Sequence, residues 1–401
     1  MDLERVLADT PIKLAYFNHL AASIPPLPVV EEVNRYFDSV LAEGSASPFT
    51  EPECYRRREE ARTLLARLVG AADPSEIAFT SCGSDALALV AGGLDWRPGD
   101  AIVTSELEFV SSYANWWWAA RRFNLGLRLA RGRPPGAVDL DHLASLLTTR
   151  TRLVALSLLP NSLGTLQPVA DAARLAHSAG ALFLLNACPG VGMVPLDVRL
   201  LGCDFLAGTG RKYLRGPTGT GFLYARRELM ERLSPPGVGW NSGEWDYGTG
   251  EFRLARGGER FSTGEPAFPN LLGLGRALSY LEGLGGPEAT WRRVRGLTAR
   301  LLQGLRGIGG VTVYGPQGME GRGAVVAFNV EGMQPAQVAD ALRREGTLIE
   351  AGDFLCPGPL RLFGVASVAR FCLHYFNTEA QVDRALEQVA SLASASGRPR
   401  G

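Results

Sequence analysis

The sequence predicts an α/β protein in which a large domain is built on a mostly parallel sheet and a smaller α+β domain follows it. Short apolar runs alternate with amphipathic stretches through the middle of the chain, as expected for strand–helix–strand units. After about residue 285 this texture changes, and strand-like segments stand between longer amphipathic helices. The 401 residues, 46% of them hydrophobic and 20% charged, are enough for two or three domains with a substantial core.

Each predicted element follows from its local pattern. Short apolar runs predict buried strands of the large domain at 76–80, 101–104, 153–157 and 181–185. Residues 169–178 have helical periodicity, which ends at Ala179-Gly180. In the small domain we expect strands at 323–330 and 369–375 and helices at about 335–345 and 378–393. We therefore divide the chain into an N-terminal arm near the small domain (1–20), a large domain (21–285), a small C-terminal domain (286–393) and a polar tail (394–401).

Composition and charge exclude several classes of protein. The formal net charge is zero and no basic stripe is present, so we expect neither nucleic acid nor an anionic membrane surface as a partner. No apolar run approaches the roughly 20 residues of a membrane span, and the N-terminus lacks a signal-peptide pattern, so we expect a cytoplasmic protein. The six cysteines include no Cys-x-x-Cys pair, and we expect no disulfide framework and no metal site.

Lysine is almost absent from this chain, which has two lysines, Lys13 and Lys212, beside thirty-nine arginines. Lys212 lies between two glycine-rich clusters in the segment 208–221. Arginine stays protonated in proteins, whereas a lysine amine can lose its proton and attack a carbonyl group. Composition alone fits a covalent anchor and a solvated loop residue equally well, so the flanking sequence has to decide.

Polar residues follow the predicted strands at the edge where ligands gather in such sheets. Gly83 and Ser84 stand between a strand and a helix, where free backbone N–H groups suit an anion such as phosphate. Ser and Gly at such positions are also ordinary helix caps. The same edge collects three more polar side chains after later strands, namely Asn161, Asn186 and Lys212.

Taken in order, these segments resemble fold-type I pyridoxal-phosphate enzymes, specifically the class V aminotransferase family. This family includes cysteine desulfurases, selenocysteine lyases and isopenicillin N epimerase-like proteins. The resemblance runs from Tyr16 to Arg384 and is most specific from Asp204 to Tyr224, a segment that the family writes with Ser-Gly-His-Lys-Trp before a Gly-Pro-x-Gly run. It implies a pyridoxal 5'-phosphate cofactor, a small-molecule amino-acid substrate and a homodimer.

The resemblance also implies roles for individual residues. Lys212 would be the catalytic residue, binding the cofactor aldehyde covalently and later moving a proton. Arg370 would bind a substrate α-carboxylate with its guanidinium fork, unless it serves only in a structural ion pair. The implied cofactor-binding residues are Gly83, Ser84, Thr209 and Arg211 around the phosphate, and Phe109, Asn161 and Asn186 around the ring.

Three positions depart from the family pattern. Asn186 stands where the family has an aspartate that keeps the pyridine nitrogen protonated, so a carbanion at the substrate α-carbon should be stabilised less. Pro189 replaces a glutamine that donates to the phenolic oxygen of the cofactor. Glu265 replaces a threonine that reaches the phosphate of the partner subunit, and Thr263 is a candidate to compensate.

Two further features leave alternatives open. Cys356 lies one position later than the nucleophilic cysteine of desulfurases and has no flanking histidine, so it is either a persulfide-forming thiol or a loop cysteine without catalytic duty. The run Trp116-Trp117-Trp118 either lines an aromatic substrate pocket or is divided between core and surface.

The sequence favours a lyase that cleaves the C–S bond of an amino acid or cysteine conjugate by β-elimination, in secondary metabolism such as antibiotic biosynthesis. A weakened electron sink disfavours reactions with a long-lived carbanion and leaves irreversible elimination or loss of CO2. The alternatives are decarboxylation-dependent deamination, an aminotransferase or epimerase, and a non-catalytic cofactor-binding relative. Retention of both Lys212 and Arg370 argues against the last of these.

Overall fold

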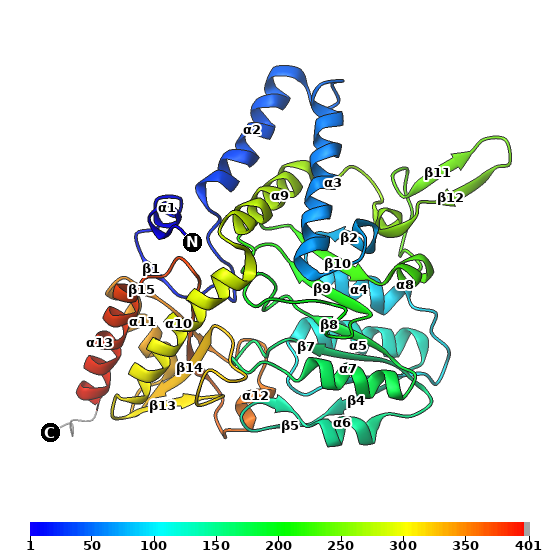
Figure 1. Ribbon diagram of the computed structural model, residues 1–401. Coiled ribbons are helices and arrows are strands. Elements are labelled where there is room, and N and C mark those ends of the chain that lie inside the picture. The colour runs from blue at the N-terminus through cyan, green and yellow to red at the C-terminus, as the bar shows by residue number, and fades with distance from the viewer. Residues whose placement is uncertain (397–401) are drawn as a thin grey trace.

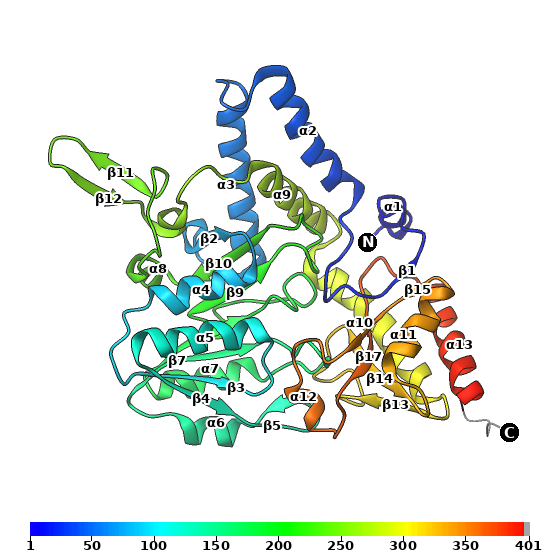
Figure 2. The same ribbon diagram turned by 180° about the vertical axis from the view of Figure 1, so that it is seen from behind.

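A seven-stranded sheet forms the centre of the computed structural model, which describes residues 1–396 (Figure 1, Figure 2). Its strand order is β2-β10-β9-β8-β7-β3-β4, and all neighbours are parallel except those of β10, which runs antiparallel to β9 and β2. This arrangement confirms the predicted α/β class. The strands are β2 (Ile77–Thr80), β3 (Ala101–Ser105), β4 (Gly126–Ala130), β7 (Thr151–Ser157), β8 (Leu182–Asn186), β9 (Phe205–Thr209) and β10 (Gly221–Ala225).

Helices cover both faces of this sheet because side chains alternate between the faces along each buried strand. In β8, Phe183 and Leu185 belong to one buried cluster, whereas Leu184 belongs to another. The first cluster includes residues of α3 (Thr50–Val69), α6 (Leu140–Leu146) and α7 (Val169–Ser178), and the second includes residues of α4 (Gly83–Gly93), α5 (Val110–Phe123) and α8 (Arg227–Arg232). The carboxyl ends of the parallel strands therefore remain the place where loops gather.

A second, antiparallel sheet in the order β13-β14-β17-β16 forms the C-terminal part with α10, α11 and α13. The N-terminal arm joins it, since β1 (Ala15–Tyr16) pairs with β15 (Thr347–Leu348). The division into domains at 285/286 stays a prediction, and α10 begins at Gly286. The elements here are α1 (Leu3–Ala8), α10 (Gly286–Arg306), β13 (Val311–Tyr314), β14 (Val325–Val330), α11 (Pro335–Arg344), β16 (Glu350–Gly352), α12 (Gly358–Arg361), β17 (Val368–Cys372) and α13 (Glu379–Ser396).

Several element boundaries differ from the sequence prediction by one or a few residues. The strand expected at 369–375 ends at Cys372, and the one expected at 76–80 begins at Ile77, because Glu76 closes a short 3-10 turn (Pro74–Glu76). The helix α13 continues to Ser396, past residue 394, where the sequence prediction begins the tail. Its last five residues, 397–401, lie outside the described part of the chain.

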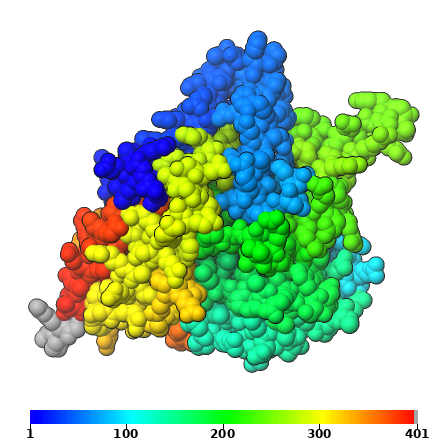
Figure 3. Space-filling view, in the orientation of Figure 1, coloured from blue at the N-terminus to red at the C-terminus, as the bar shows by residue number. Residues whose placement is uncertain are grey.

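Two segments project from the body (Figure 3). One consists of α2 (Leu27–Glu43) and the N-terminal half of α3, and α9 (Phe268–Gly283) packs beside them through Cys54, Phe268 and Leu272. The other is the hairpin of β11 (Gly243–Asp246) and β12 (Glu251–Leu254), which leads through the 3-10 turn Gly257–Phe261 toward α9. A small antiparallel pair, β5 (Gly132–Arg133) and β6 (Ala137–Val138), follows β4.

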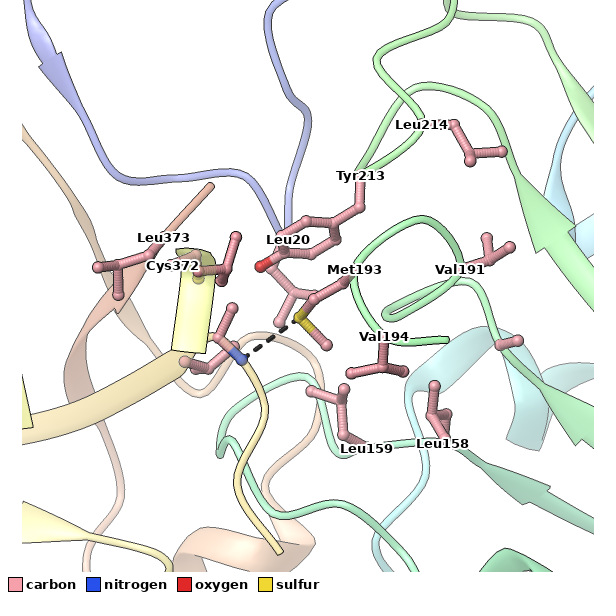
Figure 4. Packing of buried hydrophobic residues seen from close by; sticks show 14 of the residues in the cluster. Leu20, Leu158, Leu159, Val191, Met193, Val194, Tyr213, Leu214, Cys372 and Leu373 are labelled. Atoms are coloured by element: carbon pink, nitrogen blue, oxygen red, sulfur yellow. Dashed lines mark hydrogen bonds between the residues drawn. The ribbon is translucent and has the colours of Figure 1, made fainter. Parts of the chain in front are cut away.

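The arm, the loop after β9 and the C-terminal sheet share one buried junction. Figure 4 shows the Tyr213 ring among Leu20, Met193 and Cys372, and the Sδ atom of Met193 accepts a hydrogen bond of 3.3 Å from the Ala324 backbone. Because residues far apart in the sequence meet here, the segment that carries Lys212 is anchored on several sides.

Two buried histidines lie in the same junction. His374 stacks on Tyr213 at 5.2 Å between ring centroids, and His19 contacts His374 edge-on at 5.0 Å. Burial lowers the pKa of His19 to about 3 and lowers the pKa of His374 well below its usual value, and the charge of Arg215 lowers both further. Both rings are therefore neutral in the folded protein at neutral pH.

This burial predicts a loss of stability in mild acid. A histidine that stays neutral when folded but binds a proton when unfolded, near pH 6.5, contributes stability that is lost as the pH falls below 6.5 toward the folded pKa. From pH 7 to 5.5 we expect the free energy of unfolding to fall by roughly 2–3 kcal/mol from His19 and His374 together. Urea unfolding of the protein at both pH values measures this. The fall in the free energy of unfolding between these pH values should be smaller in the double variant His19→Gln/His374→Gln, and an unchanged fall in that variant would contradict the prediction.

Candidate active site

Lys212 lies in the loop between the antiparallel strands β9 and β10, at the carboxyl edge of the sheet. Its side chain is half-buried, and burial lowers the pKa of its amine to about 8. The charges of Arg211 and Arg370 lower this pKa further, while the thiols of Cys188 and Cys372 oppose them. A substantial neutral fraction near neutral pH makes the amine a competent nucleophile toward an aldehyde.

The start of α4 is built for an anion. The Cys82 side chain makes no capping hydrogen bond, so the first backbone N–H groups of this eleven-residue helix are left for a ligand. Gly83 is required here because a Cβ atom would lie 2.0 Å from the Cys188 Sγ atom. The Ser84 hydroxyl donates to Ser111 at 3.0 Å. This donor set fits the phosphate of the cofactor, and the individual phosphate contacts remain predictions.

The two other predicted phosphate residues are tied to nearby backbone. The buried Thr209 hydroxyl donates to the Thr220 carbonyl at 3.2 Å. Arg211 donates from Nη1 to the Ala21 carbonyl at 2.7 Å, and its own carbonyl accepts from the Ser23 N–H at 2.8 Å. Arg211 therefore fastens the N-terminal arm beside the site, and its phosphate role stays a prediction.

Arg370 occupies the middle of β17 and is buried. Its Nη1 atom donates to the carbonyl oxygen of Asn161, and its Nη2 atom lies 3.4 Å from Asn18 Oδ1 and 3.8 Å from Glu350. The buried Nε atom has no hydrogen-bond partner among the described residues. One edge of the guanidinium is thus available for a carboxylate, and the weak 3.8 Å contact with Glu350 makes a purely structural ion pair the poorer explanation.

A loop lies over Arg370. The Phe354 ring stacks on the guanidinium at 3.7 Å, and both Phe354 and Leu355 have left-handed backbone conformations, with φ of 56° and 53°. The loop is held by the Asn161 side-chain amide, which donates to the Phe354 carbonyl at 3.1 Å, and by the Val110 N–H, which donates to Leu355 at 3.0 Å. Non-glycine residues in this conformation store about 1–3 kcal/mol each, so the closed position is strained. The Phe354 ring covers one face of the Arg370 guanidinium.

Shortening Phe354 should open the site. A cation–π contact of about 0.5–2 kcal/mol corresponds to a roughly two- to thirty-fold faster association of a carboxylate ligand in Phe354→Ala. Stopped-flow spectroscopy of amino-acid binding measures this rate. Leu355→Ala, which has the same backbone conformation and an exposed side chain, is the matched control. Equal rates in wild type and Phe354→Ala would show that the ring does not limit access.

Asn186 forms a network that the sequence analysis missed. Its Oδ1 atom accepts from the Cys188 N–H at 3.2 Å, and its Nδ2 atom donates to the hydroxyls of Ser112 and Ser157 at 3.2 and 3.3 Å. Behind these serines lies the buried carboxylate of Glu108, which Ser157 contacts at 2.5 Å. The signal in the sequence was the acidic residue three positions after β3, next to the predicted ring-stacking Phe109.

The aromatic residues at the start of α5 and within it lie in different environments. Phe109 precedes the first turn and is partly buried, and its stacking on the cofactor ring stays a prediction. Trp116 is 1% exposed and belongs to the core beneath α4, whereas Trp117 and Trp118 are 55% and 42% exposed. An aromatic substrate pocket made by all three tryptophans is therefore wrong, because a helix turns consecutive residues by about 100°.

Cys356 is buried with its Sγ atom donating to the Leu107 carbonyl at 3.1 Å. Burial raises the pKa of this thiol to about 11.

The other positions that depart from the family pattern lie elsewhere. Pro189 is buried in the turn after β8. Thr263 and Glu265 line a cavity of about 440 Å³ together with Ser81 and Asp85, at the start of α4. Among the helices of residues 1–396, none is both long and apolar enough to cross a membrane.

Comparison with known proteins gives one consistent result. The model of the family described as aminotransferase class V matches residues 15–385. A probable cysteine desulfurase from Synechocystis sp. is 32% identical over 94% of this chain and 90% of its own, and a probable cysteine desulfurase 2 from Mycobacterium leprae is 33% identical over 99% and 98%.

Solved structures agree with this family. The chain resembles the apo cysteine desulfurase of Thermococcus onnurineus NA1, with a TM-score of 0.91, 30% identity and 98% of both chains covered. It also resembles the cysteine desulfurase CsdA of Escherichia coli, with a TM-score of 0.89, 26% identity and 98% and 99% covered. The cystine C–S lyase C-DES, at 24% identity and a TM-score of 0.84 over 95% and 99% of the chains, supports the fold alone.

Proposed function

This chain belongs to the class V aminotransferase family of pyridoxal-phosphate enzymes, and we propose that it is a C–S lyase that acts on cysteine or a cysteine conjugate by β-elimination. The observation that carries this proposal is the state of Cys356. A desulfurase transfers the substrate sulfur to a protein thiolate, whereas elimination releases the sulfur as a free thiol and needs no protein thiolate. A buried thiol whose pKa is raised to about 11 favours elimination.

Each residue of the site has its own role in this reaction. Arg370 binds the substrate carboxylate, and the loop of Phe354 covers it and excludes water. Bound pyridoxal phosphate supplies an electron-withdrawing ring that stabilises negative charge at the substrate α-carbon. Lys212 removes the α-proton through its Nζ atom, and the electron pair expels a thiolate from the β-carbon. Hydrolysis of the remaining fragment yields pyruvate and ammonia.

A second candidate is a cysteine desulfurase in which Cys356 is the sulfur acceptor. The relatives of about 30% identity that carry this name favour it. It would require the loop of Phe354 to open and Cys356 to lose its hydrogen bond to Leu107. Decarboxylation-dependent deamination and amine transfer remain further alternatives, which the products distinguish.

Product analysis tests the proposal. With cysteine conjugates we expect equal amounts of thiol and pyruvate, and Cys356→Ser should keep at least about half of the wild-type rate because the thiol takes no part. Cys203→Ser, which replaces another buried thiol, controls for packing changes. Alanine with a protein persulfide, abolished by Cys356→Ser, would establish the desulfurase instead. Release of CO2, or amine exchange that depends on a keto acid, would exclude both.

We also propose a homodimer. Large apolar side chains are exposed on the two projecting segments of Figure 3, among them Phe37, Phe49, Trp240, Trp245 and Tyr247. Exposed patches of this kind mark interfaces. A second copy bound to these segments would approach the cavity that holds Thr263 and Glu265. Analytical sedimentation measures whether the protein is a monomer or a dimer.

We further propose that the protein is cytoplasmic and that it acts in secondary metabolism, such as antibiotic biosynthesis.

A further inference from the structure

The geometry points to Glu108 as a positioning residue that supplies, through Ser157 and Ser112, the negative charge that Asn186 cannot itself offer to the ring nitrogen of the cofactor. The inference rests on the proposed function only through the cofactor, and it does not depend on which reaction follows. It also changes the expectation that the loss of an aspartate at position 186 leaves the ring without an electrostatic partner.

Glu108 is a buried carboxylate whose partners are serines. The residue is 2% exposed. Its carboxylate accepts hydrogen bonds from the Ser157 N–H at 2.8 Å, the Ser157 hydroxyl at 2.5 Å and the Ser105 hydroxyl at 3.3 Å. A charge this deeply buried is costly without a positive partner, so its presence calls for an explanation.

Groups that can only donate fix the orientation of the Asn186 amide and limit the directions of the neighbouring hydrogen bonds. The Cys188 backbone N–H donates to Asn186, so Oδ1 faces Cys188 and the amide nitrogen faces the serines. An amide nitrogen also only donates, so the Ser157 oxygen accepts from Asn186 and its own hydrogen is left free for Glu108. The Leu107 N–H donates to the Ser105 hydroxyl oxygen, which leaves the Ser105 hydrogen free in the same way. The Ser157 N–H must therefore deliver its hydrogen to Glu108, and the Ser157 and Ser105 hydroxyls have their hydrogens free to do the same, which suits an ionised carboxylate.

This network connects a negative charge to Asn186, the residue that the family resemblance implies beside the ring nitrogen. Both hydrogens of the Asn186 amide nitrogen are engaged by Ser112 and Ser157, so the amide cannot turn to present a donor to the ring. Its oxygen, polarised by the chain that ends at Glu108, is an acceptor for a protonated ring nitrogen. Coulomb attraction from a carboxylate at the far end of this hydrogen-bond path, at an effective dielectric constant near 20, would raise the ring-nitrogen pKa by roughly one to two units.

Among the titratable groups Glu108, Tyr113 and Cys356, Glu108 is the one that carries a charge near neutral pH. Burial raises the pKa of Tyr113, which donates to the Ser105 carbonyl at 2.8 Å, and burial also raises the pKa of Cys356. The negative charge of Glu108 raises the pKa values of Tyr113 and Cys356 further. Burial raises the pKa of Glu108 itself, and the hydrogen bonds from Ser157, Ser112 and Ser105 oppose that rise. We therefore expect the effect of Glu108 to fade in acid, as its carboxylate becomes protonated.

The test reads the ring nitrogen directly and without substrate. The protein is loaded with cofactor labelled with ¹⁵N in the ring, and the ¹⁵N chemical shift is followed against pH. We expect a protonated ring nitrogen in wild type at pH 7 and an apparent pKa lower by one to two units in Glu108→Gln. Glu106→Gln, which removes a charge two residues away, should match wild type. Adding Asn186→Asp to Glu108→Gln should restore protonation.

Several outcomes would overturn the inference. An unprotonated ring nitrogen in wild type would do so, as would a titration of Glu108→Gln that matches wild type. If Glu108→Gln does not fold, Ser157→Ala interrupts the same path and should lower the same pKa, and no change would be equally decisive. Because no turnover is measured, failure of this test leaves the β-elimination proposal standing, and failure of that proposal leaves this one standing.

Discussion

Replacing Lys212 with arginine should abolish activity, with a fall in kcat of roughly 10⁴-fold, the upper end of what a positioned proton-transfer group supplies. Arginine keeps the positive charge and much of the volume but cannot become neutral, so it can neither attack an aldehyde nor accept a proton. In wild type the lowered pKa of about 8 predicts that covalent binding of pyridoxal phosphate accelerates as the pH rises through 8. Absorbance of the bound cofactor, fixed by borohydride, measures this binding.

The chain offers a matched control for that experiment. Lys13, the second of its two lysines, is exposed on the N-terminal arm. After borohydride treatment, peptide mapping should find the cofactor on the peptide of Lys212 alone, and Lys13→Arg should retain full activity. Cofactor attached to Lys13, or activity that survives Lys212→Arg, would contradict the assignment.

The second large effect concerns Arg370. Its planar guanidinium donates to Asn161, stacks on Phe354 at 3.7 Å and keeps the Nε edge unpartnered. Lysine at this position would lose the fork and the stack, and one lost charge-assisted hydrogen bond of about 1.5–3 kcal/mol lowers kcat/KM by roughly 10–100-fold. Steady-state kinetics of Arg370→Lys, with the loss mainly in KM, measures it.

A substrate without a carboxylate makes this prediction specific. For the corresponding amine, wild type and Arg370→Lys should react at similar rates, because the contact in question is absent in both. Arg322→Lys is the structural control, since Arg322 is equally buried and donates to backbone carbonyls of Pro316, Val325 and Tyr314. If Arg370→Lys slows the amine as much as the amino acid, Arg370 serves folding rather than substrate binding.

The predictable part of the site was the part carried by local motifs. The segment around Lys212 and the order of strands and helices follow from contiguous sequence, and the structure brings Lys212 and Arg370 close enough for their charges to interact. The burial of Cys356 was not predictable in this way. It depends on the carbonyl of Leu107, which lies 249 positions earlier in the chain.

The tryptophans and Arg211 also show that residue type alone does not decide which neighbours a side chain has in the fold. Three consecutive aromatic residues have one local pattern, but the packing of α5 against α4 decided that Trp116 is core and that its neighbours face solvent. Arg211 has the charge expected beside a phosphate, and its guanidinium also donates to Ala21 of the arm, a contact that no local pattern records. In both cases residue type gives the chemistry that is available, and tertiary contacts decide where it is used.

By itself the sequence determined the α/β fold, the family and the single lysine suited to a covalent cofactor, because periodicity and contiguous motifs are local properties. Tertiary structure alone decided the environment of Asn186. Residues of β3, α5, β7 and β8 meet there to place a buried carboxylate behind two serines, and no local pattern records that meeting. Hydrogen-bond direction and burial depend on neighbours in space, which is why the electrostatics of this site could be read only from the fold.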